Sequence, residues 1–134
     1  MKAMTQWLGL RRLEQQIQQD MEQALSQASY PMTLNEFHVL YFLKESEGHK
    51  LQISEISDKL GLSMSATSRM LVRFEQTCGV IERHTCAEDK RAIEIALTDL
   101  GKERLAQAQE AVQPILDKYH KQLTQLTILD KSSF

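Results

Sequence analysis

The sequence has 134 residues, of which 42% are hydrophobic and 25% are charged, and its formal net charge is -2. This length suits one domain with a single core, and the composition is ordinary for a globular protein. The acidic balance argues against a general nucleic-acid binder, although a sequence-specific binder can carry its positive charge locally. No apolar stretch approaches the roughly 18 residues that span a bilayer, and the N-terminus lacks a secretory signal, so we expect a cytoplasmic protein without a membrane partner.

The first predicted element is an amphipathic helix from Met4 to about Ala28. Its apolar residues recur at steps of three and four: Leu10, Leu13, Ile17, Met21, Ala24, Leu25 and Ala28. The helix ends before Pro31, because the residue before a proline is pushed out of helical geometry. No short neighbouring element covers its apolar stripe, so we expect this helix to pack on another long helix.

The second helix has the best-marked start in the chain. Thr33 and Glu36 match a capping box, and Met32 and Phe37 stand at the two positions of a hydrophobic staple. Because the helix is apolar on most sides, it should be the buried central helix. His38 within it is either a packed histidine or a contact to an effector.

The stretch from Gln52 to Phe74 has the form of a helix-turn-helix. Residues 49–53 form a short extended link that could add a small strand. A first helix then breaks at Gly61, and Ser63 begins a second helix by capping its free N–H groups. Two short helices joined by a glycine-containing turn are the sequence form of this motif.

The second helix of the motif has two distinct faces when it is wound at 3.6 residues per turn. The face that must contact a core carries Thr67, Met70, Leu71 and Phe74. The opposite face has hydroxyls and guanidiniums and no carboxylate: Ser65, Ala66, Ser68, Arg69, Val72 and Arg73. Such a face suits the major groove of DNA, where arginine binds guanine and serine reaches a base or a phosphate. A solvated helix face is the alternative.

After Gly79, which is well placed as a left-handed helix cap, the hydrophobic period changes to two. Residues 80–85 and 92–97 are predicted strands of a ribbon, which must pack on the helix-turn-helix and so forms a wing. Candidate phosphate or minor-groove contacts on the wing are Arg83, Lys90 and Arg91. Asp89 would hold Arg91 in one orientation by a charge-assisted hydrogen bond. A solvated charged hairpin is the alternative.

The last predicted helix begins after Thr98, which caps it. Its narrow apolar seam is typical of helix-on-helix packing: Leu105, Ala108, Val112, Ile115, Tyr119 and Leu123. Pro114 removes a backbone donor, so we expect a kink or a break there. Because both terminal helices carry uncovered stripes, we expect them to pack on each other and on their copies in a twofold homodimer, whose two recognition helices would bind a palindromic site.

These elements predict a mainly α (α+β) fold: a winged helix-turn-helix with a two- to three-stranded wing and long terminal dimerisation helices. Within a single structural domain, residues 1–30 would form the N-terminal dimerisation helix and residues 99–134 the C-terminal one. Residues 31–98 would form the DNA-binding unit.

The sequence has no recognisable catalytic motif. It has no glycine-rich phosphate loop, no His/Cys cluster at metal spacing and no supported Ser/His/Asp arrangement, so we expect no catalysis, no cofactor and no metal. Cys78 and Cys86 are either structural or incidental thiols, or sensors of oxidants. Side chains that could line an effector cleft, and that suit a core or a surface equally well, are Trp7, Arg11, His38 and Phe42.

Three motifs give the chain a resemblance to a known family. They are Glu55-Ile56 to Leu62-Ser63 with Ser68-Arg69 following, then Asp89-Lys90-Arg91-Ala92, and Leu97-Thr98-Asp99-Leu100-Gly101. With them the chain resembles the MarR family of bacterial transcriptional regulators over nearly its whole length. The resemblance implies a dimeric DNA-binding regulator, usually a repressor, on which a small molecule, metal or oxidant often acts between the dimerisation and DNA-binding parts.

Carried over by motif, the residues in the major groove would be Ser65, Ser68, Arg69 and Arg73. Arg91 would lie in the minor groove, with Asp89 steadying it. The chain departs from the family pattern at Cys78, where a thiol is seldom found, at Ala66 and Thr67, and in its short C-terminal part.

The competing interpretation is a winged-helix protein–protein module, or an anti-regulator, that does not bind DNA. The acidic net charge of -2 favours it. The arginines at positions 69, 73 and 91 argue against it, because such a module has no need of a positive outer face.

Overall fold

The computed structural model describes residues 2–85 and 93–127, with the backbone but not the side chains of Thr77 and Cys78. The elements in chain order are α1 (Lys2–Ser26), α2 (Leu34–Glu45), the 3-10 turn η1 (Glu47–His49), β1 (Lys50–Gln52), α3 (Ile53–Leu60), α4 (Met64–Cys78), β2 (Ile81–Thr85), β3 (Ile93–Leu97), α5 (Asp99–Lys118) and α6 (His120–Thr127). The strands form one antiparallel sheet in the order β1-β3-β2. The mainly α winged helix-turn-helix fold is therefore confirmed, with a three-stranded sheet.

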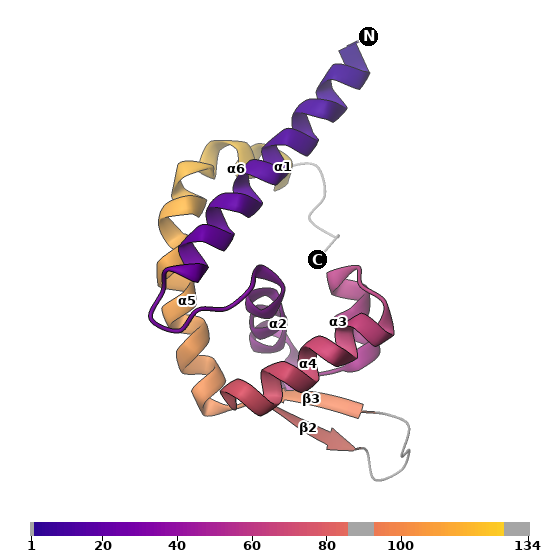
Figure 1. Cartoon of the computed structure of the whole chain (residues 1–134). Helices are drawn as coiled ribbons and strands as arrows, with labels where there is room; N and C mark the ends of the chain where they lie inside the picture. The colour runs from indigo at the N-terminus through magenta and orange to yellow at the C-terminus, as the bar shows by residue number, and fades with distance from the viewer. Residues whose placement is uncertain (1, 86–92, 128–134) are drawn as a thin grey trace.

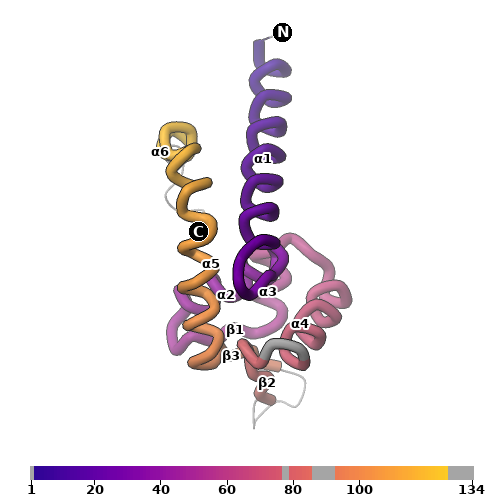
Figure 2. The backbone as a smooth tube through the Cα atoms, turned by 60° about the vertical axis from the view of Figure 1, so that its left-hand side comes forward, coloured from indigo at the N-terminus to yellow at the C-terminus, as the bar shows by residue number. Residues whose placement is uncertain are grey.

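The helices and the sheet form two parts. In Figure 1, α2, α3, α4 and the sheet lie together at the bottom, while α1 and α6 rise above them. Figure 2 shows α1 and α5 side by side, with the N-terminal part of α1 extending beyond the rest of the molecule. The expectation that the two terminal helices pack on each other is thus confirmed within one chain.

Side-chain caps begin the helices where the sequence predicts them. At α2, Glu36 N donates to Thr33 Oγ1 (3.1 Å) and Thr33 N donates to Glu36 Oε1 (2.8 Å), which completes the capping box. At α4, Ala66 N donates to Ser63 Oγ (3.1 Å). Each bond satisfies a backbone donor that has no partner inside the helix.

The turn between α3 and α4 is stabilised by a left-handed glycine and by hydrogen bonds from buried hydroxyl groups. Gly61 adopts the left-handed conformation (φ 70°) and ends α3. The buried Ser57 hydroxyl donates to the Leu62 carbonyl (2.6 Å), and the buried Thr67 hydroxyl donates to the Ser63 carbonyl (2.8 Å). Because both buried hydroxyls are satisfied, the turn can pack tightly at no desolvation penalty.

The core lies around α2, as its apolar sequence predicts. Its fully buried large side chains come from every layer of the fold: Leu25, Val39, Leu40, Leu43, Ile56, Leu71, Phe74, Val80, Ile95, Leu105 and Val112. On α1 only Met21 and Leu25 are buried, whereas Trp7 and Leu10 in its projecting part are 53% and 40% exposed. The core therefore covers only the C-terminal part of the α1 stripe.

A polar contact joins α1 to the end of α5. Tyr119 Oη donates to Asp20 Oδ2 (2.7 Å), and Lys118 Nζ lies 3.3 Å from the same oxygen. The hydrogen bond from Tyr119, supported by Lys118, lowers the pKa of the Asp20 carboxyl below its ordinary value.

Of the kink or break expected at Pro114, the break is wrong. Helix α5 continues through Pro114 to Lys118, and the chain leaves helical geometry only at Tyr119 (φ -102°, ψ 13°). Pro114 and Glu110, whose carbonyl loses its usual partner, are both exposed, so water can satisfy that carbonyl. The buried residues of the α5 seam hold the helix together, and they offset the roughly 3 kcal/mol that an interior proline costs.

Helix α5 begins against the backbone that follows α4. Thr98 N donates to the Val80 carbonyl (3.1 Å), and Thr98 Oγ1 donates to the Gly79 carbonyl (2.9 Å). A Cβ on Gly101 would lie 2.1 Å from the Val80 carbonyl oxygen and 2.6 Å from a Leu97 methyl. Only glycine fits at this position.

No helix among the described residues combines the length and the apolar character needed to cross a membrane.

We expect Gly101→Ala to destabilise the fold by about 1–3 kcal/mol or more, because the new methyl group must push the Val80 backbone away. Gly9→Ala is the matched control, since a Cβ at this exposed position in α1 meets nothing within 4 Å. It should stabilise the helix by about 0.5–1 kcal/mol. Urea denaturation measures both, and equal effects would contradict the close contact at Gly101.

We also expect Tyr119→Phe to reduce the loss of stability in acid. The Asp20 carboxylate contributes stability above its ordinary pKa of 3.8, and this contribution is lost as the pH falls through its lower folded pKa. Unfolding free energies measured over a pH series should therefore differ between wild type and variant at neutral pH and converge in acid. Tyr41→Phe, at an exposed tyrosine, is the control. A wild-type–variant difference that stays constant with pH would exclude the Asp20 contact.

Candidate nucleic-acid interface

The outer face of α4 is an exposed surface of hydroxyl and guanidinium groups. Ser65, Arg69 and Arg73 are exposed, and Ser68 and Ala66 are half-buried beside them. The opposite face is buried as predicted, with Thr67, Met70, Leu71 and Phe74 each at most 8% exposed. The sequence therefore predicts both faces of α4 correctly.

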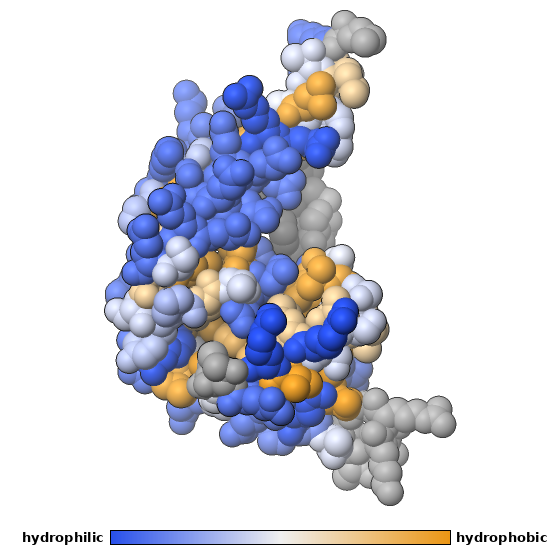
Figure 3. All heavy atoms as spheres, viewed as in Figure 1, coloured by the Kyte–Doolittle hydropathy of each residue, from blue (hydrophilic) through white to orange (hydrophobic). Residues whose placement is uncertain are grey.

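The two arginines of α4 are available for a partner. Arg69 and Arg73 are four residues apart and so lie one turn apart on the same side of the helix. With Ser68, Val72 and Gln76 they line a shallow hollow of about 330 Å³. Neither guanidinium forms an ion pair with any residue within 2–85 or 93–127. Figure 3 shows strongly hydrophilic side chains at the surface in the region of α4, with hydrophobic ones beside them.

The start of α4 is fixed by Ser63, whose hydroxyl oxygen already accepts the bond from Ala66 N. Ser63 is nevertheless exposed, so its hydroxyl hydrogen can donate outward. The N-terminal end of a helix also attracts anions, since its free N–H groups carry partial positive charge.

Arg83 lies apart from this surface. It is half-buried on β2, where its Nε lies 3.3 Å from Glu75 Oε2 on α4. This pairing could not be predicted from the sequence, because the period-two pattern of a strand does not show which side chain of α4 a strand residue contacts.

The wing strands are where the sequence predicts them, within one residue at their starts. In the ladder Ile81 pairs with Leu97 and Thr85 pairs with Ile93. The candidate contacts Asp89, Lys90 and Arg91, and the thiol of Cys86, lie outside the described residues. Cys78 is the last residue of α4, and its side chain also lies outside them.

Within one chain, the four predicted effector residues lie on two different helices. Trp7 and Arg11 are exposed on the projecting part of α1, whereas His38 and Phe42 are half-buried on α2 with ring centroids 6.1 Å apart. Burial lowers the pKa of His38 below its ordinary value. Lys59 Nζ lies 5.6 Å from the centre of the Phe42 ring.

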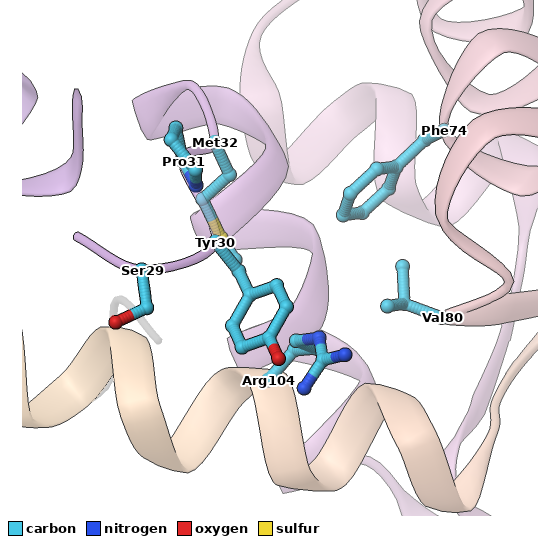
Figure 4. A pocket seen from close by; sticks show the side chains of 7 residues that line it. All are labelled: Ser29, Tyr30, Pro31, Met32, Phe74, Val80 and Arg104. Carbon is cyan, nitrogen blue, oxygen red and sulfur yellow. The ribbon is translucent and has the colours of Figure 1, made fainter. Parts of the chain in front are cut away.

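A cavity that the sequence did not predict lies between the α1–α2 loop, the end of α4 and α5 (Figure 4). It has a volume of about 300 Å³ and is lined by Ser29, Tyr30, Pro31, Met32, Phe74, Val80 and Arg104. The Arg104 guanidinium stacks on the Tyr30 ring, with its carbon 3.3 Å from the ring centre. Sequence spacing gives no signal for this cavity, since its lining comes from three distant segments.

A second, more apolar groove of about 380 Å³ lies along the α1 stripe. It is lined by Leu10, Leu13, Glu14, Ile17, Gln18, Met21, Leu34, His38, Leu123 and Leu126. His38 thus belongs to this groove, together with residues of α1 and α6. Among the described residues, no three His, Cys, Asp or Glu side chains gather in a way that could hold a metal ion.

Comparisons with known proteins agree on one family. The MarR family model matches residues 32–93, which run from just before α2 through the helix-turn-helix and β2 to the first residue of β3. The HTH-type transcriptional repressor MdtR of Bacillus subtilis (strain 168) is 29% identical over 122 residues, which are 91% of this chain and 76% of that protein.

Solved structures share the whole fold. AbsC, a MarR family transcriptional regulator from Streptomyces coelicolor, superposes with a TM-score of 0.81 at 23% identity over 96% of this chain and 87% of that chain. Sco3205, a MarR family transcriptional regulator from the same organism in complex with DNA, gives 0.76 at 21% identity over 94% and 83%. The chain therefore belongs to the MarR family of winged helix-turn-helix transcriptional regulators.

Proposed function

We propose that this regulator binds double-stranded DNA through the outer face of α4 and the wing, and that it acts as a repressor in the cytoplasm. The observation that carries the proposal is the pair of exposed arginines on α4, which lack ionic partners among the described residues and lie on a face of the helix that carries no carboxylate. A positive surface without a partner inside the protein suits the edges of bases and the phosphates around them.

The side chains on the outer face of α4 differ in length, and so they can contact different parts of the DNA. Arg69 and Arg73 are long enough to bind guanine in the major groove. Ser65 and Ser68, on the turns beside them, can donate to bases or phosphates, and Ser63 at the helix start suits a phosphate. Ala66 leaves room for a close approach of the helix to the groove.

The wing supplies the second contact. Arg91 and Lys90 would bind the backbone or the minor groove beside the α4 site, with Asp89 holding the Arg91 guanidinium. These residues follow β2 and precede β3, whose ladder fixes both ends of the wing tip.

The role of repressor is supported by the name of the Bacillus subtilis relative MdtR, which is a transcriptional repressor. Binding over a promoter blocks transcription without further chemistry, so no enzymatic activity is needed.

We further propose that the chain works as a homodimer on a palindromic operator. Residues 1–30 and 99–134 would form the dimer, and residues 31–98 would contact DNA. Support comes from the α1 stripe, where Leu10 is 40% exposed beside an apolar groove that Leu126, also 40% exposed, lines from α6. A second copy of the same helices would cover this surface and would set two α4 helices against one duplex.

Release of DNA would be controlled by a small ligand or by oxidation. The cavity of Figure 4 suits a small ligand, because it combines apolar walls with the Arg104 guanidinium and the Tyr30 ring. Phe74 and Val80 line it, so a bound ligand would contact the end of α4 directly. Oxidation would act instead at Cys78 or Cys86.

We expect Arg69→Ala and Arg91→Ala each to weaken binding by about 1–3 kcal/mol, the range for a good arginine–base contact. The probe is a duplex that the wild-type protein enriches from a random library, and fluorescence anisotropy measures the affinity. Arg12→Ala, at an exposed arginine on α1, is the control and should leave binding unchanged. All variants should melt like wild type.

A wild-type protein that binds no duplex at any salt concentration would contradict the proposal and favour a protein–protein module. Affinity unchanged in Arg91→Ala alone would remove the wing from the interface.

We expect light scattering to give twice the 15.4 kDa mass of the chain at micromolar concentration. Leu10→Glu should give the mass of a monomer, because it places a charge on the stripe. Leu8→Glu is the matched control, since Leu8 is 49% exposed but points to the opposite side of α1, two residues and so about 200° away. A monomeric wild type, or equal effects of both variants, would contradict this interface.

A further inference from the structure

Arg83 and Glu75 meet at the corner where α4 passes into β2. Arg83 Nε lies 3.3 Å from Glu75 Oε2, and the two side chains are only 23% and 33% exposed. Because α4 ends at Cys78 and β2 begins at Ile81, this contact bridges the short turn that joins the helix to the wing.

The sheet directs Arg83 toward the protein. Along β2 the buried Ile81 shares a face with Arg83, since alternate side chains of a strand point the same way. In the ladder Arg83 pairs with Ile95, which is fully buried. Its Nη2 atom is buried and has no hydrogen-bond partner among the described residues, so this part of the guanidinium lies inside the protein.

A half-buried ion pair depends on both of its members. Salt screens such a pair less than an exposed one, and loss of either partner leaves the other charge in a poorly hydrated place without compensation. The corner also sets the direction in which β2 leaves α4. Strand β2 leads in the sequence directly into residues 86–92, which include Arg91.

We propose that Arg83 and Glu75 are positioning residues for DNA binding, and that their ion pair fixes the wing against α4 so that both elements contact one duplex together. Arg83 acts through Glu75, and it does not act through a phosphate. The inference rests on the DNA binding proposed above and assigns a role to Glu75, which that proposal does not use.

The effect of Glu75→Lys on DNA affinity distinguishes two roles of Arg83, a direct contact to a phosphate and the positioning of the wing. If Arg83 contacted a phosphate, this variant would bind DNA as tightly as wild type or more tightly, because it adds positive charge near the duplex. If the pair positions the wing, the variant should bind about tenfold more weakly, which is within the range of coupling between paired side chains. Glu82→Lys, an exposed change of the same charge on the outward face of β2, is the matched control and should not weaken binding.

Rescue by exchanging the charges provides the second test. Arg83→Glu should weaken binding in either role, but the double variant with Glu75→Lys should recover most of the wild-type affinity only if the pair acts through its mutual contact. Affinity is measured by anisotropy on the duplex selected by wild type, with thermal melting as the check of folding. Should a single variant fail to fold, the double variant decides alone: near-wild-type affinity supports the pair, and persistent loss overturns it. Undiminished binding by Glu75→Lys also overturns it, whereas a wild type that binds no duplex overturns the proposed function itself.

Discussion

The structure depends on one close contact, between the first turn of α5 and the backbone that follows α4. Thr98 donates from its amide to the Val80 carbonyl and from its hydroxyl to the Gly79 carbonyl, while Gly101 N donates back to the Thr98 hydroxyl oxygen (3.0 Å). The missing side chain of Gly101 lets the helix approach this near. The end of α4, the start of β2 and the start of α5 are thereby joined at one place.

This junction explains how a small unit can present α4 rigidly. The N-terminal end of α4 is held by three hydroxyl groups: that of Ser57 bonds across the turn to the Leu62 carbonyl, and those of Ser63 and Thr67 form hydrogen bonds within the first turn of the helix. The other end is held by the α5 junction and by the contact of Arg83 with Glu75. A surface that is fixed before binding loses little conformational freedom when it meets its partner, so more of the contact energy remains for affinity and specificity.

Structural features that depend on residues close together in the chain are predicted correctly from the sequence. The cap at Thr33, the left-handed cap at Gly79 and the two faces of α4 follow from neighbours a few residues apart, and each is confirmed. Prediction fails where the decisive neighbour is distant or where exposure matters. The expected break at Pro114 does not occur, because packing on the buried side of α5 outweighs one lost hydrogen bond on the exposed side.

In the candidate site, too, features set by nearby residues are predicted, whereas contacts between distant elements are not. Period and spacing correctly place Arg69 and Arg73 on an outer face, since a helix fixes their direction. The pairing of Arg83 with Glu75 and the stacking of Arg104 on Tyr30 bring together different elements, and no period in the sequence encodes them.

Hydroxyl-radical footprinting would show whether two copies of α4 face one duplex. On a duplex selected by the intact chain, we expect two symmetric protected patches on one side of the DNA, about one helical turn or 34–36 Å apart. A single asymmetric patch, or protection spread evenly along the duplex, would contradict it.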